Sequence, residues 1–511
     1  MARFGLIGPS YQSQSLTADC QVTRNWYPEI IESGTGKAQM ALYPTPGTKV
    51  FTTIPDAPIR AQLEINGRSF AIAGATFCEV KSDGSYAIIA PVTNDQLPAS
   101  MVASPEQLLI ASGGNLYVYQ LQTQTGIALG TGVAGSFVQV PNSNFSLPSG
   151  AYGQPSIVEF LDGFFLVLLR NSQTFYISTL FDATSWPGLQ KIIVSVFSDN
   201  VQTFIVNQRR LSVQGKKRST TYYDSGSLNI LDVDPSGTIE NGIVSPFANC
   251  RLDNSVFWLD QDERGAGVAR RLSGYTPTRI SNHAIEYAIQ GYPVINDCVV
   301  YSYQDQGHAF AVFFFPTAQK TWVYDVATGM WHERGYWNVS TAMFSAHKSQ
   351  NHVFAFGKHL VGDPGSGNIY QMSISLYDDS GNAIKRVRRS PHISIENHWM
   401  FHNELVLDIE TGLGPQPPLV DGAGNARGPQ VMLRWSNDYA HTWSNEYPLD
   451  AGQAGRYRHR VRRSRLGRAR DRVYEISVAD PIPWRVIDGY LNADPGYKPQ
   501  ERLVASIGKA S

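Results

Sequence analysis

The densest group of chemically distinctive residues is a run of arginines between positions 456 and 472. Asp471 is the one acidic residue among them. Guanidinium groups bind carboxylates and phosphates through paired N–H donors. The run therefore predicts either ion pairs with acidic neighbours or another subunit, or contact with nucleic-acid phosphates without sequence readout. The candidate contact residues are Arg456, Arg458, Arg460, Arg462, Arg463, Arg465, Arg468, Arg470 and Arg472.

If this run is a strand, its side chains alternate between two faces. We then expect most of the arginines to meet acidic residues and only a minority to contact phosphates. A second, smaller basic cluster lies at residues 385–389. In such a strand, one face would carry Arg456, Arg458, Arg460 and Arg462, and the other would carry Tyr457, His459 and Val461.

An octet at residues 436–443 has the layout of an Asp box, with Ala440 in its glycine position. Its carboxylate can accept hydrogen bonds from turn N–H groups, which makes a stable hairpin turn. Asp boxes are a mark of sialidases, so a propeller glycoside hydrolase of sialidase type is the alternative function. In sialidases, however, the box is structural, and we predict the same here. The turn residues are Ser436, Asp438, Thr442 and Trp443.

Other catalytic and cofactor sites are not indicated. The acidic pairs at 260–263 and 378–379 fall in expected hairpin loops, where carboxylates are usually solvated. Residues 33–37 resemble the end of a phosphate-binding loop but lack its first glycine, and Ala38 stands where the magnesium-binding hydroxyl belongs. No His-Glu-x-x-His pattern is present, and the four cysteines are far apart. We therefore expect no metal, no cofactor, no disulfide framework and no enzyme.

The elements that carry these residues are predicted to be strands. The 511 residues are 42% hydrophobic and 17% charged, which excludes a disordered chain, and 45 Gly, 29 Pro and 11% aromatic residues favour short strands joined by turns. Lys+Arg and Asp+Glu number 42 and 43, so total charge indicates no partner. Seven hairpin patterns recur, and each suits one propeller blade. They lie at 63–73, 102–111, 157–167, 204–213, 250–259, 299–313 and 346–356.

The sequence thus predicts an all-β chain in three parts. Residues 1–58 form an N-terminal arm and opening strand, residues 59–380 form a β-propeller of about six to seven blades, and residues 381–511 form a smaller β-rich domain with an extended tail. One short helix is expected at 282–289. The first residues lack the apolar run of a signal peptide, and the longest apolar runs are too short to span a bilayer. We expect folding in a cytoplasm without membrane insertion.

Several blocks along the chain are distinctive when taken together. They lie at 43–47, 257–265, 274–281, 283–286, 433–438 and 465–472.

In these blocks the chain resembles the packaged-DNA stabilisation proteins of short-tailed bacteriophages. The resemblance implies a structural protein of the virion tail, the hub or nozzle, assembled in the cytoplasm of a bacterial host. It implies a ring of six copies below the portal and adaptor proteins that closes the DNA exit channel and stabilises the packaged DNA until genome ejection. Tail spikes or fibres and a plug or needle are the further partners implied, and no catalytic residues come with the family.

Overall fold

The structure is a computed structural model that describes residues 2–122, 133–226, 230–261, 265–415 and 419–496. It divides the chain into two compact units. One unit comprises Thr45–Ile384, and the other combines Met1–Pro44 with Lys385–Ser511. Within the described residues, no helix is both long enough and apolar enough to cross a membrane.

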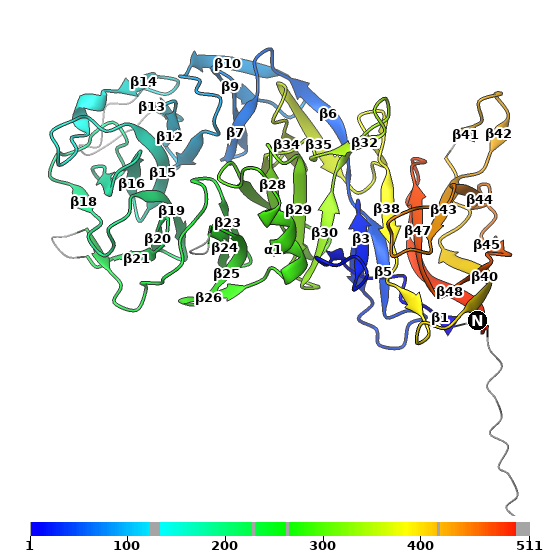
Figure 1. Ribbon diagram of the computed structural model, residues 1–511. Helices are drawn as coiled ribbons and strands as arrows, with labels where there is room; N and C mark the ends of the chain where they lie inside the picture. The colour runs from blue at the N-terminus through cyan, green and yellow to red at the C-terminus, as the bar shows by residue number, and fades with distance from the viewer. Residues whose placement is uncertain (1, 123–132, 227–229, 262–264, 416–418, 497–511) are drawn as a thin grey trace, which may run out of the picture. The chain divides into compact units, whose positions relative to one another are not determined.

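The unit at Thr45–Ile384 is a β-propeller. Its described residues form seven groups of four antiparallel strands, each group one blade, and the first strands of successive blades contact one another around a closed ring. In Figure 1 the colours follow this ring from blue through cyan to green and yellow-green. Six sheets use four consecutive strands each: β7 (Ile59–Ile65), β8 (Arg68–Ala73), β9 (Thr76–Val80), β10 (Tyr86–Pro91); β11 (Ser100–Ala103), β12 (Gln107–Ser112), β13 (Asn115–Gln120), β14 (Phe137–Val140); β15 (Pro155–Leu161), β16 (Phe164–Leu169), β17 (Thr174–Ile177), β18 (Lys191–Ile193); β19 (Val201–Asn207), β20 (Arg210–Gly215), β21 (Ser219–Asp224), β22 (Leu231–Val233); β23 (Asn249–Leu252), β24 (Ser255–Gln261), β25 (Gly267–Ser273), β26 (Thr276–Arg279); β27 (Val299–Asp305), β28 (His308–Phe315), β29 (Lys320–Asp325), β30 (Met330–Arg334).

The last sheet is completed by a strand from the start of the unit. Strand β6 (Gly47–Thr53) pairs antiparallel with β35 (Asn368–Ser373), so the beginning and the end of the propeller sequence share one sheet. This pairing closes the ring, because it leaves no sheet without neighbours on both sides. The sheet consists of β33 (Asn351–Ala355), β34 (Lys358–Gly362), β35 (Asn368–Ser373) and β6 (Gly47–Thr53), extended by β36 (Asp378–Asp379) and β37 (Asn382–Ala383).

Six of the seven predicted hairpins are confirmed as the first two strands of their sheets, whereas the seventh range, 346–356, contains β33 and ends before β34. Their turns have the backbone that tight hairpins need. Asn66 and Gly67, for example, have φ values of 54° and 76°, a left-handed pair that Asn-Gly adopts readily. The predicted helix is α1 (His283–Gln290), and the Asn282 side chain caps it by accepting a hydrogen bond from the Ile285 N–H.

Hydrophobic side chains fill the space between successive sheets. Phe70 of the first sheet and Ile110 of the second belong to one cluster, and Phe175 and Phe204 join the third sheet to the fourth. Each sheet alone would leave both faces in water, so the ring is the arrangement that buries them. The loops between sheets contain three short elements, which are the 3-10 helix η1 (Asn142–Asn144) and the paired strands β31 (Tyr336–Asn338) and β32 (Met343–Ser345).

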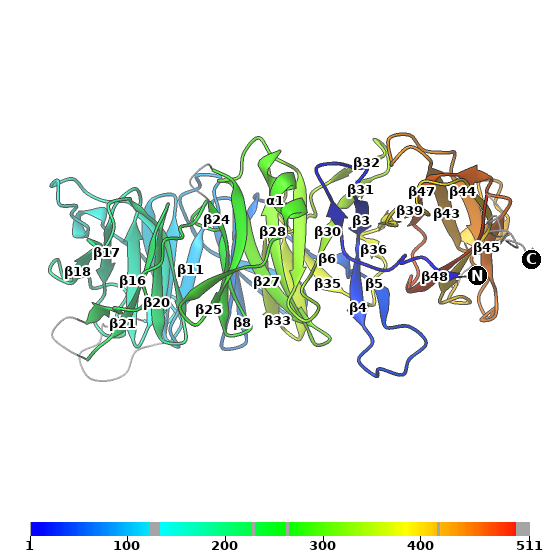
Figure 2. The same cartoon turned by 60° about the horizontal axis from the view of Figure 1, so that its bottom comes forward.

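The second unit is a sandwich of two sheets. Leu405, Leu433 and Trp484 are among the residues of its core, and all three are at most 1% exposed. Figure 2 shows strands from both ends of the chain in this unit, coloured blue and yellow to red. One sheet has β4 (Trp26–Ile30), β5 (Met40–Pro44), β48 (Val486–Pro495), β40 (Met400–Ile409), β45 (Val461–Ser464), β1 (Ala2–Arg3) and β46 (Arg468–Ala469); the other has β3 (Cys20–Arg24), β38 (Arg386–Arg389), β47 (Asp471–Val478), β43 (Gln430–Ser436), β44 (Tyr447–Asp450), β2 (Tyr11–Gln12) and β39 (Ile393–Ser394); β41 (Leu419–Val420) and β42 (Ala426–Arg427) form a separate hairpin.

The observed boundaries differ from the expected ranges at the N-terminus. The segment expected as an arm at 1–58 is divided: residues up to Pro44 add strands to the sandwich, and Thr45 onwards belongs to the propeller. The physical reason is non-local pairing, since β3 bonds to β38 and β6 bonds to β35. The expected extended tail begins inside β48, and its residues 497–511 lie outside the described part of the chain.

Candidate functional site

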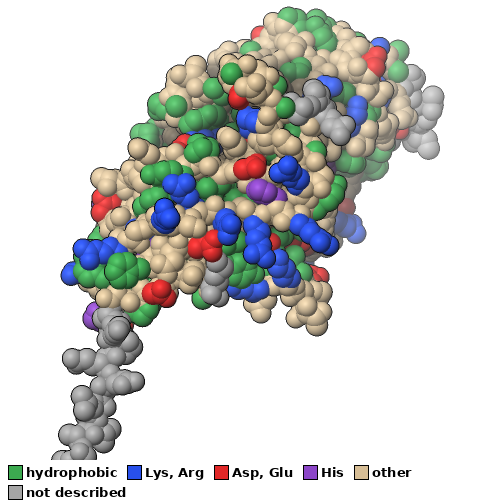
Figure 3. Space-filling model, turned by 90° about the vertical axis from the view of Figure 1, so that its right-hand side faces the viewer, with side chains coloured by type: hydrophobic (Ala, Val, Ile, Leu, Met, Phe, Trp, Pro, Cys, Tyr) green, Lys and Arg blue, Asp and Glu red, His purple; other side chains and the backbone are tan. Residues whose placement is uncertain are grey.

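The arginine run lies on and around β45, β46 and the start of β47 in the sandwich unit. Eight of its nine arginines are exposed, and Arg472 is buried. Lys and Arg side chains gather on the side of the molecule shown in Figure 3. The run is therefore mostly a surface feature, with one internal member.

The prediction that this run is a strand is wrong for its first five residues, 456–460. Arg456 to Arg460 lie in turns, in which the Arg456 N–H donates to the Gln453 carbonyl and the His459 N–H donates to the Arg456 carbonyl. Strand β45 begins only at Val461, whose side chain is buried. Tyr457, which the strand interpretation placed on the same face as Val461, is 72% exposed. The positive φ angle of Gly455, 85°, redirects the backbone just before the run, which a simple alternation cannot anticipate.

Arg472 is a structural residue. Its Nε donates to Asn437 Oδ1 at 2.8 Å, and its Nη1 donates to the Leu466 carbonyl at 2.7 Å. The guanidinium also lies 5.6 Å from the centre of the Trp435 ring. Arg472 thus ties the end of the arginine run to the Asp-box octet, and its charge does not reach the surface.

The Asp box forms a compact turn after β43. Asp438 accepts hydrogen bonds from Ser436 Oγ at 2.6 Å, from the Thr442 N–H at 2.9 Å and from Thr442 Oγ1 at 2.6 Å. These bonds, led by that from Ser436, lower the pKa of the Asp438 carboxyl to about 2. Ala440 holds the glycine position at φ 68°. All three hydrogen bonds described for the Asp438 side chain lie within its own turn.

Trp443, the last residue of the box, is contacted by two arginines, one from β38 and one from β43. The Arg389 and Arg434 guanidinium carbons are each 4.8 Å from its ring centre. Both arginines bind Glu475: Arg389 Nε donates at 2.9 Å and Arg434 Nε donates at 2.7 Å. The three charged residues are cross-strand neighbours on β38, β47 and β43. This cluster, Arg389–Glu475–Arg434–Trp443, is hereafter called the Glu475 cluster.

The smaller basic cluster at 385–389 is also structural. Arg388 is fully buried and donates to the carbonyls of Leu6 and Pro9, to Thr23 Oγ1 at 2.8 Å and to Gln21 Oε1 at 2.6 Å. Burial lowers its pKa to about 9. One side chain therefore holds the first strands of the chain against the C-terminal half of the sandwich.

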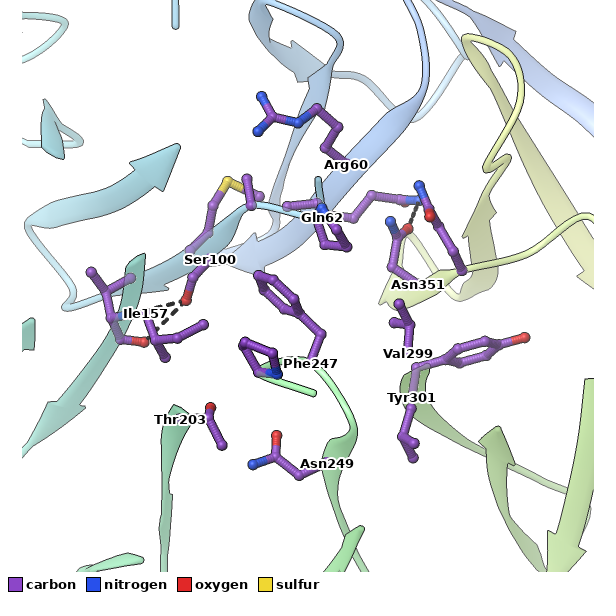
Figure 4. Close-up of a pocket in the computed structure, with 18 of the residues that line it drawn as sticks. Arg60, Gln62, Ser100, Ile157, Thr203, Phe247, Asn249, Val299, Tyr301 and Asn351 are labelled. Carbon is purple, nitrogen blue, oxygen red and sulfur yellow. Dashed lines mark hydrogen bonds between the residues drawn. The ribbon is translucent and has the colours of Figure 1, made fainter. Parts of the chain in front are cut away.

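The centre of the propeller contains a cavity of about 230 Å³, lined by the inner strands (Figure 4). Its polar side chains join neighbouring sheets. Gln62 Nε2 donates to Asn351 Oδ1 at 2.7 Å, and Ser100 Oγ accepts from the Val158 N–H at 3.0 Å. Buried Glu159 lies 3.3 Å from Arg251, and burial raises the pKa of its carboxyl. These contacts hold the ring together.

A larger hollow of about 850 Å³ lies at the turns of four propeller sheets. His352 Nε2 and His359 Nδ1 are 3.0 Å apart in its wall. Burial lowers the pKa of His352 to about 3 and lowers that of His359, so the pair is neutral near pH 7. Among the described residues, no group of three or more His, Cys, Asp or Glu side chains could hold a metal ion.

Two carboxylates expected in solvent are instead buried. Asp260 lies in β24 at 1% exposure and accepts hydrogen bonds from Asn241 Nδ2 at 2.7 Å and Arg270 Nε at 2.6 Å. Asp379 is 8% exposed and accepts from Thr48 Oγ1 at 2.9 Å on the closing strand. The solvated interpretation is wrong for both because their partners are distant in sequence. Residues 262 and 263 lie outside the described part of the chain.

The four cysteines are buried free thiols. Burial raises the pKa of Cys78 and Cys250 to about 12, so both stay protonated and unreactive near neutral pH. Sequence reasoning missed Glu475, and it noted Arg388 only as a member of the basic cluster at 385–389. Nothing local in the sequence marks the partners of either residue.

Two family models match the chain. One, described as "Bacteriophage P22 Gp10, beta-propeller", matches residues 12–377. The other, described as "Bacteriophage P22 Gp10, beta-sandwich", matches residues 385–493. The two matches correspond to the predicted propeller and C-terminal β-rich domain. No curated protein sequence matches the chain.

Solved structures share only a general likeness. The extracellular domain of the putative one-component system BT4673 from B. thetaiotaomicron is 9% identical over 80% of this chain, with a TM-score of 0.42, and the chain spans about half of it, 47%. The N-terminal domain of Nup159 is 10% identical, with 69% and 98% of the two chains covered and a TM-score of 0.40. The WD40 propeller domain of Doa1 is also 10% identical, with 64% and 96% covered and a TM-score of 0.39.

Proposed function

We propose a function from one premise, which is that the chain belongs to the bacteriophage P22 Gp10 family. The chain is accordingly a phage structural protein with a propeller and a sandwich. We place it in the virion tail as a subunit of the hub or nozzle. Six copies form a ring below the portal and adaptor, close the DNA exit channel and stabilise the packaged DNA. Tail spikes or fibres and a plug or needle bind to this ring.

The observation that carries the proposal is the order and extent of the two matches. They cover residues 12–377 and 385–493, so both domains of the family are present in one chain. A ring of identical subunits needs a heterologous interface that closes by rotation. Hydrogen bonds join neighbouring sheets in the propeller cavity and neighbouring strands in the Glu475 cluster, which supports each unit as a building block of such a ring.

The alternative of a sialidase-type hydrolase has no observation in its favour. The Asp box lies in the sandwich unit, outside the propeller, and its carboxylate is bonded within its own turn. A retaining or inverting glycosidase needs two carboxyl groups facing a sugar. Glu159, the carboxyl group in the wall of the central cavity, is buried against Arg251. The function proposed here therefore includes no chemical step.

The proposal is tested by removing the protein from the infection. Particles made without it should package DNA and then lose it, because the exit channel stays open. Adding the purified protein to freshly filled particles should restore DNA retention, measured as nuclease-protected DNA. A matched addition of heat-denatured protein is the control. Particles that retain their DNA without the protein would contradict the proposal.

A further inference from the structure

The exposed arginines of the 456–472 run differ in their partners. Arg462 Nη1 lies 3.3 Å from Glu404, and among the described residues this is the one pair between an arginine of the run and a carboxylate. Arg472 is buried and bonded internally. The remaining seven have no carboxylate within 4.0 Å in the part of the chain that the structure describes. They are Arg456, Arg458, Arg460, Arg463, Arg465, Arg468 and Arg470, here called the arginine surface.

Aromatic rings support part of the arginine surface. The Arg468 and Arg470 guanidinium carbons lie 4.7 and 5.0 Å from the centre of the Trp399 ring, which is 41% exposed. Arg463 lies 4.6 Å from the Tyr447 ring. Cation–π contact restricts the flexible side chains and leaves their charge in place. These three guanidinium groups are thus held at the surface with free N–H donors.

Three acidic residues of the same unit form ion pairs with cations outside the arginine surface. Glu475 binds two arginines, Asp480 pairs with Arg427 at 2.6 Å, and Asp471 pairs with His392 at 2.7 Å. The formal net charge of the whole chain is −1, so the positive arginine surface is a local imbalance. Such a surface attracts polyanions over distances near the Debye length.

We propose that the arginine surface binds the phosphate backbone of double-stranded DNA without reading its sequence. The inference rests on the proposed function, which brings DNA through the tail. Guanidinium groups bind phosphates bidentately, and a row of them on an exposed surface suits a regular polyanion. A protein partner would instead need apolar anchors in buried pockets. Here Trp399 and Tyr447 are contacted by arginines of the run, and Tyr457 within the run is 72% exposed and not seated in a pocket.

Counterion release predicts how steeply the DNA-binding constant should fall as the salt concentration rises. The slope of log K against log salt concentration is about −0.9 for each phosphate neutralised. Between three and seven engaged arginines would give slopes of about −3 to −6 for duplex DNA. Replacing three of them should reduce the slope by about 3.

The test measures binding of the full-length protein to a fluorescent duplex of random sequence by anisotropy, from 50 to 200 mM NaCl. The test variant combines Arg458→Gln, Arg460→Gln and Arg463→Gln. The control variant combines Arg209→Gln, Lys216→Gln and Arg218→Gln, which removes the same charge from exposed propeller residues. We expect the test variant to lose about 3 units of slope and the control to lose less than about 0.5. Equal losses in both variants, or none in either, would overturn the proposal.

Competition separates DNA from an acidic protein partner. Unlabelled duplex should displace the probe at far lower charge concentration than polyglutamate does. If polyglutamate competes equally well, the surface is a general site for acidic proteins and the proposal is wrong. The result is independent of the proposed function: a virion that holds six copies but whose protein does not bind DNA overturns only this inference. DNA binding by a protein absent from virions overturns only the proposed function.

Discussion

Replacing Glu475 should destabilise the sandwich unit and leave the propeller unchanged. The Glu475 side chain is 4% exposed, and those of Arg389 and Arg434 are 17% and 32% exposed. Removing one partner from a buried ion pair costs about 3–5 kcal/mol, because a buried charge is left without compensation. The arginines retain some solvent and the Trp443 ring, so we expect about 3 kcal/mol for Glu475→Gln.

This loss can be measured by thermal unfolding. For a unit of roughly 150–250 residues, 1 kcal/mol shifts Tm by about 2–4 °C, so the sandwich transition should fall by about 6–12 °C. The matched control is Glu446→Gln, since Glu446 lies 4.0 Å from Lys385 and is 37% exposed. That change should cost less than about 1 kcal/mol. A sandwich transition unchanged by Glu475→Gln, or an equal shift in the propeller transition, would refute the reasoning.

Three further predictions concern the turn, the propeller histidines and the N-terminal segment. Asp438→Ala should cost about 1 kcal/mol in chemical denaturation, because the exposed Thr442 N–H and hydroxyl lose their acceptor, whereas an unchanged midpoint would contradict the structural role. Burial lowers the pKa of His332 and His352 to about 3, so their contribution to stability is present above pH 6.5 and is lost as the pH falls toward 3. A propeller Tm that stays constant from pH 7.5 to pH 4 would show this to be wrong. Arg388→Leu should free the first strands and expose them to limited proteolysis, whereas a digestion pattern like that of the wild type would rule out the anchoring role.

Much of the propeller could be predicted from local sequence. Each inner hairpin combines a short apolar strand, a turn and a second apolar strand, and turns such as Asn66-Gly67 and Asp162-Gly163 have the positive φ angles that these residue types favour. The number of sheets was harder to predict, because the last one needs β6 from near residue 50. Pairing between segments about 320 residues apart leaves no periodic signal in either one.

The sandwich was harder still to predict, because segments far apart in the sequence build it. Its core combines Leu6, Trp26 and Leu42 with residues beyond 400, and no local pattern connects them. The arginine run was evident from composition, but its turns and exposed Tyr457 depend on the backbone around Gly455. Sequence reasoning expected ion pairs with acidic residues of the same domain or of another subunit. Within the described chain, Arg462 is the one exposed arginine of the run that pairs with a carboxylate, and pairing with another subunit stays a prediction.

The most direct test of the central claim is the number of copies of this protein in an intact virion. Quantitative mass spectrometry of purified particles, with the portal subunit as an internal standard, gives that number. A ring subunit of the tail predicts six copies in each virion. One or two copies, or absence of the protein from purified particles, would contradict the account.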